Sequence, residues 1–222
     1  MHIEPGLVDP SKIALSYATA AAAGATGLYF AGQALRERGL PSLVLRSLTA
    51  TVLTFVFFEV LPHVPVGVSE VHLILGSTLF LLLGAGPSAI GLALGLLIQG
   101  LFFAPSDLPQ YGMNLTTLLV PLFALHEVAR RVIAPGTPYV DLRYAQVMQM
   151  SLIYQGGIVA WVAFWALYGQ GFGATAAIAS FGLAYMSVVL LEPLVDLAVL
   201  AAAKALRGRL PEALVARRLY AA

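Results

Sequence analysis

The first two residues, Met1-His2, carry the most informative chemistry in the sequence. A histidine in second position offers one ion the α-amine, the amide nitrogen of residue 2 and the imidazole. Binding closes a five-membered and a six-membered chelate ring together. Nitrogen ligands close to one plane suit Ni(II), Co(II) or Cu(II) better than tetrahedral zinc. The opening residues therefore predict a transition-metal site, and the alternative is that His2 belongs to a frayed terminus.

Two further histidines flank a polar loop that could complete such a site. His63 and His72 lie at either end of residues 62–72, which also contain Glu70. His72 begins an apolar segment and could supply a fourth nitrogen, or it could be an interfacial histidine bonded to a loop carbonyl. Ionisable residues near the membrane interior are costly and usually face a partner or a cavity. We expect His63 and Glu70 either to orient the ligands or to be hydrated loop residues.

Other polar side chains interrupt the apolar segments. Gln99 and Asn114 bracket a loop at residues 102–107, where they could hold the loop over a pocket or form hydrogen bonds between helices. Glu192 and Asp196 are four residues apart and so share one helix face. They require partners in the bundle, and a structural role is favoured over proton transport.

Composition places the chain in the membrane. The sequence has 222 residues, of which 59% are hydrophobic and 10% are charged, and its mean hydropathy is +0.87. Apolar stretches long enough to cross about 30 Å of hydrocarbon recur along the chain. The absence of cysteine excludes disulfides and thiolate sites. The net charge of +1 gives no indication of nucleic-acid binding, and the polar opening segment does not resemble a signal peptide.

Hydrophobic patterning predicts an all-α, polytopic transmembrane helical bundle in one domain, residues 1–222. It has about seven spans, at residues 13–34, 42–61, 71–84, 88–103, 115–132, 145–167 and 174–206. The third and fourth spans are short and are separated by a glycine- and proline-containing reversal at residues 84–87. These two spans could instead form one kinked or re-entrant pair, so six or eight elements remain alternatives.

Basic residues predict the orientation. With seven spans, every Lys and Arg except Lys12 falls on one side, and that side should be cytoplasmic. We therefore expect a multi-pass protein of the cell (inner) membrane with its N-terminus outside and its C-terminus in the cytoplasm. Residues 1–12 would form a metal-capping loop, and residues 207–222 a basic cytoplasmic tail.

Small residues line one face of the first span. Ala14, Ala18 and Ala22 repeat every four residues, a pattern that lets another helix approach closely. The default partner is another span of the same chain, and the alternative is a separate subunit.

Two other classes of protein stay open. An intramembrane hydrolase could use Ser88 with His126, but no oxyanion motif accompanies them and no His-Glu-x-x-His motif occurs. We interpret His126-Glu127 as a packing or interface pair on the cytoplasmic side. A scaffold subunit without a ligand of its own would fit the small-residue face. The chain has no GxxxxGK[ST] loop, so any ATP hydrolysis must occur in partners.

A family resemblance joins these features. Met1-His2-Ile3 with Gly6, the segment 69–73, Gln99, the Gly112-Met113-Asn114 element and Glu192 before a basic final helix occur in this order. Together they resemble the CbiM/NikM substrate-binding membrane subunits of energy-coupling-factor transporters for cobalt and nickel, a class of ABC transporter permease. The resemblance covers nearly the whole chain.

The resemblance implies Met1, His2 and His72 as ligands of a transported Co(II) or Ni(II), with no permanent cofactor and no enzyme activity. It also implies a membrane coupling subunit and cytoplasmic ATPase subunits as partners, contact with the lipid bilayer, and no nucleic acid. Two departures stand out. Glu4 is separated from Gly6 by a proline, which puts the fold of the N-terminal loop in question although Glu4 can still serve nearby. His63 replaces a usual asparagine, which could enlarge the ligand set or alter the choice of metal.

Overall fold

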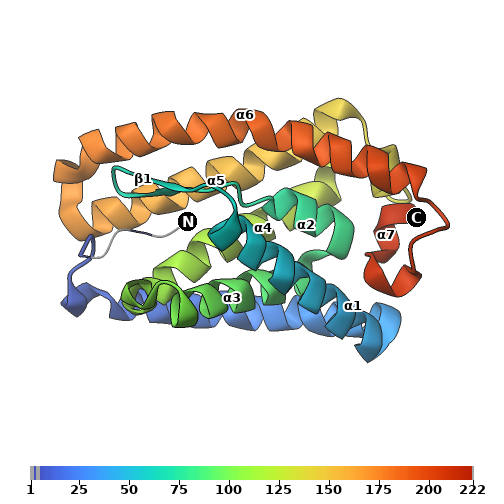
Figure 1. The fold of residues 1–222 in the computed structure, drawn as a ribbon, viewed down its shortest axis with the longest axis horizontal. Coiled ribbons are helices and arrows are strands. Elements are labelled where there is room, and N and C mark those ends of the chain that lie inside the picture. Colours follow the sequence, from blue (N-terminus) through green and yellow to red (C-terminus); the bar gives the residue numbers. More distant parts are fainter. Residues whose placement is uncertain (1–2, 4–5, 222) are drawn as a thin grey trace.

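Long helices lie side by side along the molecule in the computed structural model, which describes residue 3 and residues 6–221 (Figure 1). The α-helices are α1 (Ala14–Phe55), α2 (Gly76–Leu83), α3 (Ala85–Phe102), α4 (Tyr111–Val132), α5 (Tyr144–Gln170), α6 (Thr175–Ala205) and α7 (Arg217–Tyr220). Two short strands, β1 (Val64–Val66) and β2 (Ser69–Val71), form an antiparallel hairpin. Short helical turns occupy Pro10–Lys12, Val56–Val60, Pro105–Gln110, Tyr139–Asp141, Gly171–Ala174 and Glu212–Leu214.

Within the described residues, four apolar helical stretches are long enough to cross a membrane: Pro10–Val60, Ala85–Phe102, Pro105–Val132 and Tyr144–Ala205. The first has 51 residues and would extend about 76 Å if straight, far more than one crossing needs. Gly39 breaks it with φ 77°, and Figure 1 shows α1 reversing there. The chain is thus an all-α membrane protein with about four long apolar stretches, and the first stretch runs in both directions.

The third predicted span differs from the structure. Helix α2 begins only at Gly76 and has eight residues, which is about 12 Å, so the prediction of a helix from residue 71 was wrong. The chain first completes β2, then continues without regular structure to Leu75. Gly84, with φ 87°, ends α2 directly before α3 begins. An apolar sequence is equally compatible with burial of an extended segment, and hydropathy alone does not separate the two cases.

Glycines bring α1 and α3 into close contact. A Cβ at Gly91 would overlap Ala50, and one at Gly95 would lie 2.7 Å from the Thr54 side chain. On the first half of α1, Gly27 faces Ala89 of α3, with its hypothetical Cβ 3.4 Å from the Cβ of Ala89. Small residues therefore set the spacing between these helices.

The predicted stripe of Ala14, Ala18 and Ala22 does not take part in that packing. All three residues are exposed. The default expectation, that another span of this chain covers them, was therefore wrong. The inward face of α1 lies one residue further on, at Ala23 and Gly27, which are buried.

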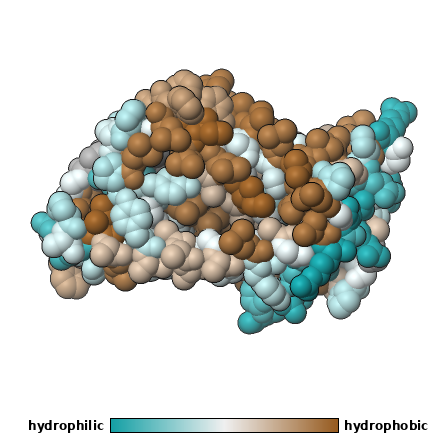
Figure 2. Space-filling model, turned by 90° about the horizontal axis from the view of Figure 1, so that it is seen from below, coloured by the Kyte–Doolittle hydropathy of each residue, from teal (hydrophilic) through white to brown (hydrophobic). Residues whose placement is uncertain are grey.

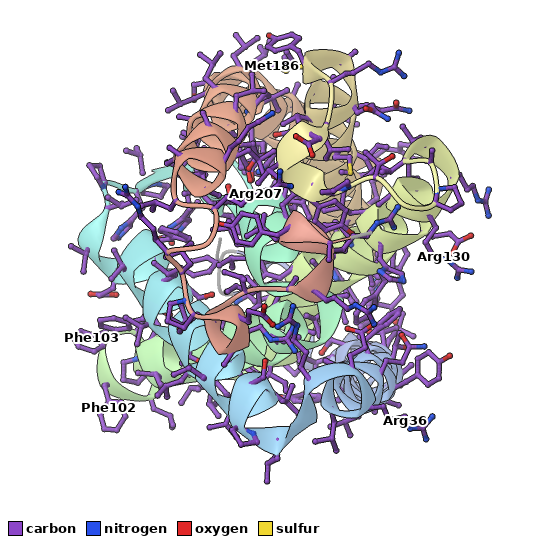
Figure 3. All side chains as sticks on the ribbon, turned by 90° about the vertical axis from the view of Figure 1, so that its right-hand side faces the viewer. Arg36, Phe102, Phe103, Arg130, Met186 and Arg207 are labelled. Atoms are coloured by element: carbon purple, nitrogen blue, oxygen red, sulfur yellow. The ribbon has the colours of Figure 1, made fainter. Side chains whose placement is uncertain are left out.

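The molecular surface is apolar in its middle and polar at one end. Leu28 and Leu183 are 71% and 76% exposed, as expected of side chains that face lipid. Figure 2 shows hydrophobic residues over the middle of one face and hydrophilic residues gathered at the right-hand end. In Figure 3 that end faces the viewer, with Arg36 and Arg130 pointing outward at its rim and Arg207 in the middle of the view. The same end holds the reversal of α1 and the described C-terminal residues (Figure 1).

Candidate metal centre

The β1–β2 hairpin leads directly into His72, which lies beside the middle of α6. The strands pair Val64 with Val71 and Val66 with Ser69, and Gly67 makes the turn with φ 65°. A Cβ at Gly67 would overlap the backbone oxygen of Ala177 on α6, so the turn packs directly on that helix. The hairpin is thereby fixed against α6, and the chain leaves β2 at His72.

His72 is buried and closely surrounded. The residue is only 1% exposed, and its Nε2 lies 2.9 Å from Oε2 of Glu70. The ring of His63 stacks on it with centroids 4.9 Å apart and planes at 12°. Phe58 contacts the His72 ring with centroids 5.1 Å apart. The structure thus brings together the three polar residues that the sequence singled out around this loop.

The N-terminal segment is tied to the same place through Ile3. The Ile3 N–H donates to Oδ1 of Asn114 over 2.8 Å, and Ile3 pairs with Ser69 of β2 in an antiparallel bridge. Both Ile3 and Ser69 are fully buried, and Asn114 is 1% exposed. Asn114 therefore holds the N-terminal segment rather than the 102–107 loop.

The start of α4 allows Asn114 to reach this position. A Cβ at Gly112 would lie 2.9 Å from the backbone oxygen of Ser16, so only glycine lets α4 approach α1 this closely. Thr116 and Thr117 bond back to the carbonyl groups of their own helix. The polar turn of α4 is therefore internally satisfied, and Asn114 is left to bind the terminal segment.

Gln99 lies apart from His72. Its Nε2 donates to Oε2 of Glu59 over 3.5 Å, which ties α3 to the π-helical turn Val56–Val60. Sequence reasoning missed Glu59 and Phe58. The carboxyl group of Glu59, beside the proline-bounded loop, was a signal that could have found it, whereas nothing in the pattern marked Phe58.

Met1, His2 and Glu4 lie outside the described residues. Within Ile3 and residues 6–221, no three His, Asp or Glu side chains are grouped so as to hold a metal ion. The described part of the site is therefore a histidine with an acidic neighbour, beneath the point where the terminal segment is fixed.

The opposite end contains packing contacts and ion pairs. The His126 ring packs on Phe30 with centroids 4.5 Å apart, and Glu127 pairs with Arg130 and Arg131 on the same helix, in agreement with their interpretation as a packing pair.

At the same end, the C-terminal part of α6 contacts the connection between α4 and α5. Lys204 donates to Oδ1 of Asp141 over 2.9 Å, and this hydrogen bond lowers the pKa of Asp141. Burial raises the pKa of the neighbouring Tyr139. These contacts join the end of α6 to the connection between α4 and α5.

The long apolar helices and the polar site at one end define a multi-pass membrane protein. The sequence profile described as the cobalt uptake substrate-specific transmembrane region, CbiM, matches residues 2–210. The chain belongs to this family, and the resemblance noted in the sequence is confirmed. The description of the family assigns this region to the transmembrane part of cobalt uptake systems.

A curated relative and a solved structure are also similar. A protein of Haemophilus influenzae (strain ATCC 51907 / DSM 11121 / KW20 / Rd), named as a metal transport protein, is 33% identical over 136 residues. That alignment covers 61% of this chain and 60% of the relative. A crystal structure described as a truncated transition-metal transporter is 19% identical, with a TM-score of 0.67 over 93% of this chain and 98% of that chain. At this identity the second likeness concerns the fold alone.

Proposed function

We propose that the chain captures Co(II) or Ni(II) from outside the cell through the α-amine and backbone nitrogen of the Met1-His2 terminus, the His2 imidazole and His72. The observation that carries the proposal is the position of Ile3, which is bonded to Asn114 and paired with β2. The family membership of the chain supports the choice of cargo.

The pairing direction makes this ligand set possible. Ile3 and Ser69 pair antiparallel, and His72 follows Ser69 by three residues. Consecutive Cα atoms are only about 3.8 Å apart, which limits how far any residue next to Ile3 can lie from this point. The contacts of Ile3 therefore support a ligand set that combines the terminus with the buried imidazole of His72.

Glu70 and His63 act on His72 in this proposal. A carboxylate at 2.9 Å from Nε2 fixes the orientation and tautomer of the ring that would bind the metal. The stacked His63 ring restricts rotation of His72. Gln99 and Glu4 have supporting roles in this proposal. Gln99 does so by bonding Glu59 in the turn that precedes the hairpin.

The orientation of the chain follows from its two ends. We infer seven passages, the third being the extended segment with α2, with the N-terminus outside and the C-terminus cytoplasmic. The hairpin and the α5–α6 connection lie at one end in Figure 1, and the outward-pointing arginines lie at the other in Figure 3, which supports a cytoplasmic assignment for the second end. Residues 1–12 then cap the site and residues 207–222 form the tail.

Uptake requires partners. The chain is proposed to work as one domain in the cell membrane with a membrane coupling subunit and cytoplasmic ATPases. The exposed face at Ala14, Ala18 and Ala22 offers that coupling subunit a close helix contact. Release of the metal would follow from movement of the whole subunit driven by ATP.

The test is a Co(II) and Ni(II) titration of purified full-length protein with its Met1-His2 start intact. A version with two alanines added before Met1 converts the Met1 amine into an amide and moves the histidine to fourth position, and a version with two alanines added after Ala222 is the matched control. Binding to the native and control proteins, and its loss in the N-terminally extended protein, is expected. Equal binding in all three would place the site elsewhere, and no binding in any would favour a scaffold role.

A further inference from the structure

A second polar cluster lies buried between α2 and α6. Glu192 and Asp196 of α6 are fully buried and face Ser77 and Thr78 at the start of α2. Ser77 Oγ lies 3.1 Å from Oε1 of Glu192 and 2.7 Å from Oδ2 of Asp196, and the Thr78 hydroxyl donates to Oδ1 of Asp196. No Lys, Arg or His in the described part of the chain forms an ion pair with either carboxyl group.

The surroundings of the pair contain unused polar atoms. Oη of Tyr154, on α5, is buried and has no hydrogen-bond partner among the described residues, and the same holds for Oε2 of Glu192. The Tyr154 ring lies against Gly76, where an added Cβ would overlap it. Tyr185 completes the titratable neighbours and donates its own hydroxyl to Gln155 over 2.6 Å. Buried polar atoms without partners require an explanation in a native structure.

Counting hydrogens shows what the cluster must hold. A serine hydroxyl has one hydrogen to donate, yet Ser77 Oγ stands at hydrogen-bond distance from two carboxyl oxygens. If both acids were ionised, one of these contacts would place a carboxylate oxygen against the Ser77 oxygen with no hydrogen between them. A proton on Glu192 removes the conflict, because Glu192 then donates to Ser77 and Ser77 donates to Asp196.

Electrostatics agrees with this count. Two neighbouring carboxylates in a buried site without a cation are strongly disfavoured, and one of them retains a proton.

We propose that Glu192 and Asp196 together bind one proton at neutral pH through Ser77, and that this proton clamps the start of α2 to α6. The backbone amides of Gly76 and Ser77, the first two residues of α2, also face Glu192. Ionisation of both acids would place two negative charges against each other and open the clamp.

The clamp fixes a strained part of the chain. Leu75, directly before α2, has φ 54°, in the left-handed region that non-glycine residues adopt only when their surroundings enforce it. It is 7% exposed, and His72 lies only three residues earlier. The proton site therefore fixes the point at which the segment carrying His72 enters the bundle. The proposal of a bound proton does not depend on the proposed metal binding.

Infrared spectroscopy of the purified full-length protein at neutral pH tests the proposal. A carbonyl stretch of a protonated carboxyl group is expected in the wild-type protein, absent from Glu192→Gln and retained in Glu212→Gln, whose side chain is 88% exposed. Absence of the band from the wild-type protein, or its persistence in Glu192→Gln, would overturn the proposal. Loss of the band when the choline chloride in the buffer is replaced by NaCl would also overturn it, because that result would indicate that the two carboxyl groups bind sodium.

The pH dependence of thermal unfolding gives a second readout. The folded protein binds a proton that the unfolded chain releases at neutral pH, so the melting temperature of the wild-type protein should fall as the pH rises above neutral. Glu192→Gln should lack this part of the fall, since its amide can donate to Ser77 permanently. The same pH dependence in both proteins would contradict a proton at this site. If Glu192→Gln does not fold, the wild-type infrared band still decides.

Discussion

The His72 region and the Glu192 cluster are both buried polar sites, but they are built differently. The first is assembled from a hairpin, Ile3 and the start of α4, where the Ile3 N–H donates to Asn114. The second lies between helices, where Ser77 contacts both carboxyl groups and Thr78 contacts Asp196. Terminal and loop segments open locally at a low free-energy cost, whereas a site between packed helices opens only when the helices separate.

This difference suggests a division of roles. The region around His72 is suited to admit and release a ligand, because it is built from a hairpin loop and a terminal segment and not from packed helices alone. The Glu192 cluster is suited to fix the start of α2, and with it the segment that carries His72. Substitutions at the two sites should therefore separate ligand affinity from stability.

The largest effect is expected from His72→Ala. Loss of a proposed ligand should weaken Co(II) and Ni(II) binding by more than about 100-fold, since even the groups that only support a ligand contribute 10–100-fold. Isothermal titration on the folded variant measures this. His126→Ala, at the opposite end of the bundle, is the matched control, and an equal loss in both variants would show that the effect is not local.

Ser77→Ala should mainly reduce stability. It removes the hydroxyl between two buried carboxyl groups, and leaving such groups without their partner costs about 1–3 kcal/mol. Thermal unfolding in detergent, compared with Ser180→Ala on the exposed face of α6, gives the difference. A melting temperature equal to that of Ser180→Ala would remove the distinction between the two sites.

Asn114→Ala should act in the opposite sense, on binding more than on stability. The variant leaves the buried N–H of Ile3 without its acceptor, and a loss of about 1.4 kcal/mol in positioning corresponds to tenfold weaker metal binding. The helices themselves keep their packing. A large fall in melting temperature with unchanged metal affinity would show that Asn114 serves the bundle and not the terminal segment.

The smallest effect is expected from Lys204→Ala. Its partner Asp141 is partly exposed, and exposed ion pairs contribute little to stability because water screens them. Because the folded protein lowers the pKa of Asp141, the stabilisation is present near neutral pH and is lost as the pH falls through that lowered pKa. Melting temperatures of the two proteins should therefore converge in acid, and a gap that persists there would assign another role to Lys204.

Much of the fold was predictable from apolar length. Each long helix occupies a segment that hydropathy had marked, and Gly39 breaks α1 within the charged gap between the first two predicted spans. The short α2 was not predictable, because the apolar residues before Gly76 satisfy burial equally well in an extended chain. The outward direction of Ala14 was missed for a similar reason, since several small-residue stripes on one helix satisfy the same spacing.

The site was predictable in its residue types and less so in its contacts. Histidine and acid at the ends of one loop indicated His72 with Glu70, and the structure brings them to 2.9 Å. The partner of Asn114 could not be predicted, because it is a backbone N–H 111 residues away. Backbone groups leave no trace in a sequence pattern, so contacts to them appear only once the chain is folded.

The metal titration of the native and N-terminally extended proteins tests the central claim most directly. Retention of Co(II) or Ni(II) by the native protein, and its loss on adding two residues before Met1, is the predicted result, because the added residues convert the Met1 amine into an amide and move the histidine to fourth position. Unchanged affinity in the extended protein would contradict the account and remove the terminal amine from the site.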